Sequence, residues 1–163
     1  MSHSTVAQNI SPAPLARWAQ ELASNESSWT QQVRQAAASR FATLGFPTTR
    51  EEAWKYTNMA PIAKIPFTLA GDERAGVTDA VLARASCGLM AGHRLVFVNG
   101  QYAPELSALR PLPAGVIVGS LAAALSAHRS RVEAHLARYA SFQNHAFVAL
   151  NTACMQDGAF ISI

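Results

Sequence analysis

The N-terminal part of the sequence shows the i, i+3, i+4, i+7 spacing of apolar residues that is typical of amphipathic helices. After a lead-in at residues 1–13 that we expect to be flexible, a first helix is predicted from Leu15, Trp18, Ala19 and Leu22. A longer helix is predicted to begin at Ser27 or Ser28, because a hydroxyl can accept a hydrogen bond from an unpaired backbone N–H. Gly45 ends this helix, and its expected apolar stripe is Trp29, Val33, Ala36, Ala37, Phe41 and Leu44.

A capping-box pattern follows at Thr49. With Thr49 as the N-cap, Glu52 falls at the third helical position, where its carboxylate can accept a hydrogen bond from the N–H of the cap. This pattern predicts a short helix that carries Trp54. Residues 61–76 contain prolines and polar residues and indicate a loop with room for one short strand, whereas residues 78–86 indicate another short helix.

After Arg94 the pattern becomes typical of strands. The apolar run 95–98 is followed by Asn99-Gly100, which tolerates positive φ at both turn positions, so we expect a β-hairpin with residues 101–103. Residues 116–118 predict a third strand, which leads into a helix capped by Ser120. Two further helical stripes are Val132, His135, Leu136 and Tyr139, and then Phe147, Leu150, Asn151 and Cys154.

The last residues, 159–163, form an apolar strand after an Asp157-Gly158 turn. No strand follows it, so we expect its backbone groups to lack a partner within this chain. Together these elements predict an α+β fold that is mainly α, with a small β-hairpin or sheet around residues 94–118. The expected organisation is the lead-in at 1–13, a mostly helical domain at 14–158, and the start of a further structure at 159–163.

Composition excludes several classes of protein. Half of the residues are apolar and 14% are charged, which argues against intrinsic disorder. No apolar run approaches the roughly 20 residues of a membrane-spanning helix, and the polar N-terminus does not resemble a secretory signal, so we expect a cytoplasmic protein without membrane contact. The net charge of +3 is dispersed along the chain, so we expect no nucleic-acid binding. Cys87 and Cys154 are expected to stay reduced.

The sequence lacks the common phosphate-binding, metal-binding and nucleophile motifs, and we expect no catalytic, cofactor-binding or metal site. His128 and His135 could share a helix face, but only Glu133 lies nearby as a further ligand, which is too few for zinc. Cys154 is expected to be a buried structural thiol. Cys87 has only His93 as a nearby group that could lower its pKa. Glu51 and Glu52 are adjacent, so their side chains diverge and cannot act as an acid–base pair.

Several collinear stretches resemble the SufD family of iron–sulfur cluster assembly scaffold proteins. The first is Leu44-Gly45-Phe46-Pro47-Thr48-Thr49-Arg50-Glu51-Glu52-Ala53-Trp54-Lys55-Tyr56-Thr57. The others are residues 95–107, residues 112–116, and residues 147–153 with 157–161. Together they cover residues 39–163, whereas residues 1–35 show only general helical similarity.

The resemblance implies a scaffold that joins SufB-like and SufC-like subunits in a SufBCD complex. It also implies that a right-handed parallel β-helix, missing here, begins at the last strand, and that the cluster ligands lie outside this chain. No functional residue is therefore carried over, and we expect a protein–protein interaction role without catalysis or a bound cofactor. A thiol enzyme that uses Cys87 and a weakly basic nucleic-acid-binding module are the alternatives. The terminal strand also suggests self-association through its edge.

Overall fold

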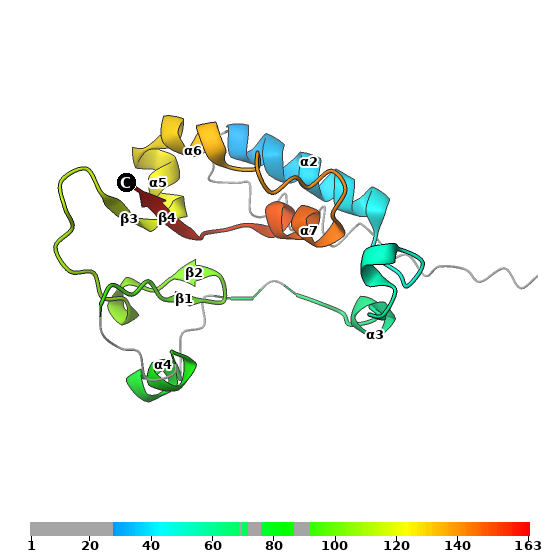
Figure 1. The fold of residues 1–163 in the computed structure, drawn as a ribbon, viewed down its shortest axis with the longest axis horizontal. Coiled ribbons are helices and arrows are strands. Elements are labelled where there is room, and N and C mark those ends of the chain that lie inside the picture. The colour runs from blue at the N-terminus through cyan, green and yellow to red at the C-terminus, as the bar shows by residue number, and fades with distance from the viewer. Residues whose placement is uncertain (1–27, 69, 72–75, 87–91) are drawn as a thin grey trace, which may run out of the picture. The chain divides into compact units, whose positions relative to one another are not determined.

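The computed structural model describes residues 28–68, 70–71, 76–86 and 92–163 (Figure 1). These residues form two compact units. Unit 1 comprises the described residues up to Thr68 together with Leu136–Met155, and unit 2 comprises those from Ala70 to His135 together with Gln156–Ile163. The first predicted helix, around Leu15–Leu22, lies outside the described residues. The predicted boundaries at residues 13 and 158 stay predictions.

Unit 1 is built on two long helices that pack against each other. They are α2 (Ser28–Leu44) and α7 (Ala146–Cys154), and the turn-like η2 (Glu52–Trp54) and α3 (Ala60–Ala63) follow α2 along the chain (Figure 1). The core between α2 and α7 is made largely of small side chains, which allow a close approach of the helices: Ala37, Ala38, Ala149 and Ala153, with Phe41. As predicted, α2 ends at Gly45, whose φ of 66° closes the helix with a hydrogen bond from its N–H to Phe41 O.

The buried face of α2 differs from the predicted apolar stripe. Ala37 and Phe41 are buried as expected, but Ala36 is exposed and the polar residues Thr30 and Arg34 are buried. Arg34 reaches the end of α7, where its guanidinium donates a hydrogen bond to Met155 O. A cation that pairs with a carbonyl at a helix C-terminus is favourable, and this long-range contact explains why an arginine occupies the core face.

In place of the predicted capping box at Thr49 and Glu52, a hydrogen-bonded turn at Thr48–Glu51 follows α2. Thr48 N donates to Glu51 Oε1 at 2.9 Å, and Arg50 N donates to Thr48 Oγ1 at 3.3 Å. These bonds have the spacing of a capping box, but they close a turn, and η2 begins after Glu51 without a side-chain cap. The turn that follows is the single 3₁₀ turn η2 instead of an α-helix.

Unit 2 contains two separate two-stranded antiparallel sheets. The predicted hairpin is confirmed: β1 (Phe97–Val98) pairs with β2 (Gln101–Tyr102) across Asn99 and Gly100, whose φ values are 52° and 81°. The helix α4 (Asp79–Ala85) is capped by Thr78, and its Leu82 packs with Val96 of the strand region. The short η3 (Pro104–Leu106) follows the hairpin.

The second sheet corrects two predictions. The strand β3 (Ile117–Ser120) does not extend the hairpin but pairs antiparallel with the last strand, β4 (Ala159–Ser162), with Val118 opposite Ile161. The terminal strand therefore has a partner within this chain, contrary to expectation, because a segment about forty residues earlier supplies its ladder. Whether a β-helix follows it stays a prediction.

Two short helices follow β3. They are α5 (Leu121–Ala127), capped by Ser120 as predicted, and α6 (Arg129–His135). The predicted stripe through Tyr139 stops at His135, since Ala137 takes a φ of 60° that a helix cannot contain. The described residues thus confirm an α+β fold that is mainly helical, with small antiparallel sheets.

Candidate functional site

In unit 2 the carboxylate of Asp157 accepts hydrogen bonds from several segments of the chain. Its Oδ1 accepts hydrogen bonds from Ser120 Oγ at 2.8 Å, Ala122 N at 2.9 Å and Gly158 N at 2.8 Å. Its Oδ2 accepts a hydrogen bond from Tyr102 N at 3.1 Å. One carboxylate therefore joins the hairpin, the beginning of α5 and the segment that leads into β4. The sequence identified only a turn at this position.

The arrangement completes the N-terminus of α5. Ser120 Oγ accepts a hydrogen bond from Ala123 N at 3.2 Å and donates to Asp157, which in turn accepts from Ala122 N. Two N–H groups of the first turn are thus paired by side chains, and a negative charge lies at the positive end of the helix. Leu121 N also donates to Gly158 O at 2.7 Å, which continues the β3–β4 register. These hydrogen bonds of Ser120 and Asp157 stabilise the fold, and none of their donors is left for a substrate.

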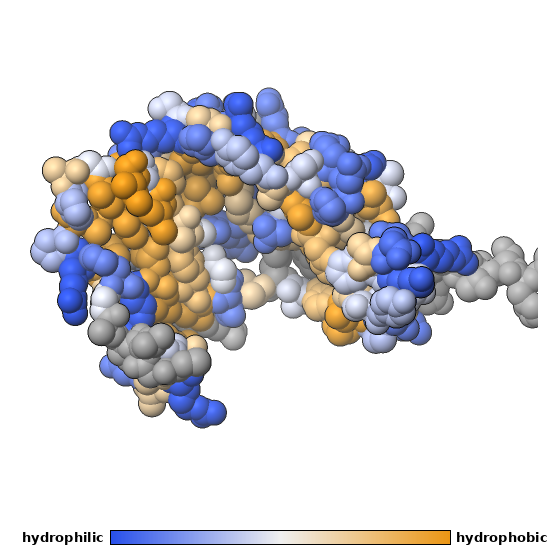
Figure 2. All heavy atoms as spheres, in the orientation of Figure 1, coloured by the Kyte–Doolittle hydropathy of each residue, from blue (hydrophilic) through white to orange (hydrophobic). Residues whose placement is uncertain are grey.

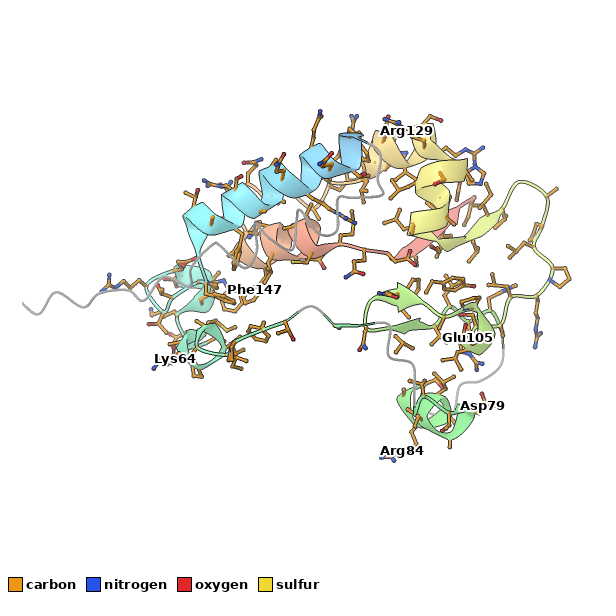
Figure 3. All side chains as sticks on the ribbon, turned by 180° about the vertical axis from the view of Figure 1, so that it is seen from behind. Lys64, Asp79, Arg84, Glu105, Arg129 and Phe147 are labelled. Carbon is orange, nitrogen blue, oxygen red and sulfur yellow. The ribbon has the colours of Figure 1, made fainter. Side chains whose placement is uncertain are left out.

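The structure places the two histidines, which the sequence left as too few for a zinc site, in different surroundings. His128 is the C-cap between α5 and α6, and its ring stacks on Phe160 with 6.0 Å between the ring centroids. His135 is exposed at the end of α6. Glu133 pairs instead with Arg129, which lies four residues earlier in α6 and is labelled in Figure 3. Among the described residues, no group of three histidine, cysteine or acidic side chains could hold a metal ion.

The two cysteine hypotheses have different outcomes. Cys87 lies outside the described residues, and its proposed neighbour His93 is exposed, with Nδ1 accepting a hydrogen bond from Arg110 N at 3.2 Å. Cys154 is half-buried and packs against the core of α2 and α7, as expected for a structural thiol. Burial raises the pKa of the Cys154 thiol, and the nearby Arg34 guanidinium offsets this in part.

The block that resembles known scaffold proteins folds around an aromatic cluster in unit 1. Phe46 makes edge-to-face contacts with Phe41 and Phe147, at centroid distances of 5.3 and 5.7 Å. Trp54 lies 5.3 Å from Phe147, which Figure 3 labels beside the segment that follows α2. These contacts hold η2 against the first turn of α7. Glu51 and Glu52 are both exposed, and Glu51 caps a turn instead of acting in an acid–base pair.

Sequence reasoning did not identify an exposed apolar surface just after this block. Tyr56, Ile62, Ile65 and Phe67 are all exposed. The Lys55 ammonium lies over the Tyr56 ring, 5.6 Å from its centroid. A signal was present in the sequence: Ile62, Ile65 and Phe67 lie close to Pro61 and Pro66, which prevent a long amphipathic helix that could bury them. In the described part of the chain, no helix is long and apolar enough to span a membrane.

Comparison with known proteins gives evidence about the family of this chain, which the geometry alone does not give. A family model described as the SufBD protein N-terminal region matches residues 16–163. A curated iron–sulfur cluster assembly SufBD family protein of Synechocystis sp. is 35% identical over 132 residues, which is 80% of this chain. The same match covers 28% of the Synechocystis protein, so this chain corresponds to only part of its relative's length. No solved structure matches the chain.

Proposed function

Because the chain belongs to the SufBD family, we propose that it is the N-terminal domain of a SufD-like scaffold subunit in iron–sulfur cluster assembly. Its role in this proposal is structural and interactive, without catalysis or a bound cofactor of its own. Its proposed partners are SufB-like and SufC-like subunits in the cytoplasm. The observation that carries the proposal is the match of residues 16–163 to the N-terminal region of this family.

The hydrogen bonds that polar side chains make within the fold support the same proposal. The carboxylate of Asp157 caps a helix and ties strands together, Glu51 caps a turn, and Arg34 pairs with the end of α7. An enzyme site instead aims such groups at a shared point where a substrate can bind. A scaffold domain needs a firm framework and an available surface, and the described residues supply both.

A complementation experiment tests the proposed function. In a strain that lacks the gene, we expect lower activity of iron–sulfur enzymes such as aconitase. The full gene should restore it, and a gene without codons 16–163 should not. Protein levels, measured by immunoblot, separate loss of function from degradation. Normal aconitase activity in the deletion strain under iron limitation would remove the support for a role in cluster assembly.

Self-association through the terminal strand is a further part of the proposal. The strand β4 pairs with β3 along one edge, and Ile161 is exposed. Its other edge has no strand partner among the described residues, so it can accept a strand from a second copy. Light scattering at increasing concentration should show dimers, and an Ile161→Lys variant should remain monomeric. A monomer at high concentration in both proteins would contradict this part alone.

A further inference from the structure

One short segment of unit 1 presents four large apolar side chains to solvent. We call it the apolar patch, and it consists of Tyr56, Ile62, Ile65 and Phe67, with exposed fractions of 92%, 39%, 49% and 47%. Figure 2 shows apolar atoms beside strongly polar ones over the region of α3. Exposed apolar side chains are ordinary when scattered, but their concentration in one segment is typical of an interaction surface.

The backbone holds this segment in a defined conformation. Met59 is buried directly before α3 and anchors it, while Ala63 N donates to Met59 O at 3.0 Å. The next turn is closed by hydrogen bonds from Ile65 N to Ile62 O at 3.0 Å and from Phe67 N to Ile65 O at 2.9 Å. The exposed side chains are therefore carried by an ordered turn, which lowers the entropic cost of binding a partner.

The charged side chains between the residues of the apolar patch, and directly beside them in the sequence, are basic. Lys55 and Lys64 are exposed within it, and residues 53–68 contain no acidic residue. Figure 3 shows the labelled Lys64 at the end of α3. The described residues of unit 1 contain only two acidic side chains, Glu51 and Glu52, against basic residues that also include Arg40, Arg50 and Arg138. A partner that covers the patch gains most when its own rim is acidic.

We propose that the apolar patch binds an acidic amphipathic segment of a partner protein, an assignment that rests on the interaction role proposed above. Phe67 and Ile65 act as apolar anchors, Tyr56 contributes aromatic area, and the two lysines pair with acidic side chains at the rim. An anionic membrane fits the patch less well. Two lysines contribute about 1 kcal/mol each at a charged membrane surface, and a short turn buries less apolar area than an interfacial helix.

Two fluorescent amphipathic peptides serve as probes against the full chain. They share one stripe of leucine and phenylalanine, and their polar faces carry either glutamate or lysine. We expect the glutamate peptide to bind, measured by fluorescence anisotropy, at least tenfold more tightly than the lysine peptide. Its binding should weaken as salt rises, because the lysine contacts are screened. Equal binding of both peptides, or binding of neither, would overturn the proposal.

Matched variants locate the binding. Ile65→Asp and Lys64→Glu should each weaken binding of the glutamate peptide, by about tenfold and about threefold. The controls Val81→Asp and Arg84→Glu change exposed residues of α4 in unit 2 and should leave binding unchanged. Circular dichroism confirms that each variant is folded, as expected for exposed positions. Equal effects of test and control variants would contradict the assignment.

Two further measurements test membrane binding and separate the proposed surface from the proposed function. Sedimentation with phosphatidylserine vesicles tests the membrane directly, and vesicle binding that Ile65→Asp abolishes, without binding of the glutamate peptide, would overturn the proposal. Complementation with the unmodified gene distinguishes a wrong surface from a wrong function. If the peptide fails to bind while the unmodified gene still restores aconitase activity, only the proposed surface is wrong. If the unmodified gene restores nothing, the proposed function fails as well.

Discussion

Replacement of Asp157 by alanine should destabilise unit 2 more than any other single acidic substitution among the described residues. The change removes the acceptor of Ala122 N and Tyr102 N, at 2.9 and 3.1 Å, and the partner of Ser120 Oγ. Loss of the helix cap at the exposed Ala122 N costs about 1 kcal/mol, and the half-buried Tyr102 N–H left without a partner costs about 1 kcal/mol or more. Because the site is only half-buried and water replaces some contacts, we expect a total of about 2–3 kcal/mol.

One variant separates the causes of this loss of stability, and a second serves as a control. Asp157→Asn keeps an oxygen acceptor but loses the charge that complements the start of α5, so we expect a loss of about 1 kcal/mol. Glu133→Ala removes an acidic side chain that pairs with the exposed Arg129, and it should cost less than about 0.5 kcal/mol.

Urea unfolding followed by far-UV circular dichroism gives the overall change in stability. Hydrogen exchange of the Ala122 and Tyr102 amides gives the local one, and both amides should exchange faster in Asp157→Ala. The reasoning is refuted if Asp157→Ala matches Glu133→Ala in stability and both amides keep their protection.

Three further outcomes follow from unit 1. Arg34→Ala should lower the free energy of unfolding by about 2–4 kcal/mol in urea titrations, because it removes a buried group and the partner of Met155 O; a change below 0.5 kcal/mol would contradict this. Phe147→Ala should cost about 2–3 kcal/mol and shift the fluorescence of Trp54 to the red, since the ring that covers the indole is lost. Cys154 should react with iodoacetamide more slowly than free cysteine and with a higher pH midpoint, measured in a chain whose other cysteine is serine, because burial raises its pKa.

The sequence predicted the features that depend on neighbouring residues. The Asn99-Gly100 hairpin, the end of α2 at Gly45 and the capping of α5 by Ser120 all follow from local backbone rules, and all are present. The capping box was predicted with the correct spacing, but its hydrogen bonds form one residue earlier and close a turn instead of capping a helix. Adjacent threonines and adjacent glutamates offer two equivalent registers, and the sequence alone does not distinguish them.

The missed features depend on contacts between distant segments. Arg34 is buried because its guanidinium donates a hydrogen bond to Met155 O at the end of α7. A prediction of the buried helix face from hydropathy alone excludes arginine. The pairing of β3 with β4 joins residues about forty positions apart, so no local pattern reveals it. Asp157 had one signal, since it is the only acidic residue after Glu133, but its four donors come from three separate segments.

The most direct test of the scaffold role is native mass spectrometry of the complex purified through a tag on the full gene product. The account predicts an assembly that contains the SufB-like and SufC-like proteins encoded in the same genome. It also predicts that this assembly still forms, and that the gene still restores aconitase activity, when Cys87 is replaced by serine, because the proposed role gives this chain no catalytic group. A product that purifies alone, with an enzymatic turnover abolished by Cys87→Ser, would contradict the account.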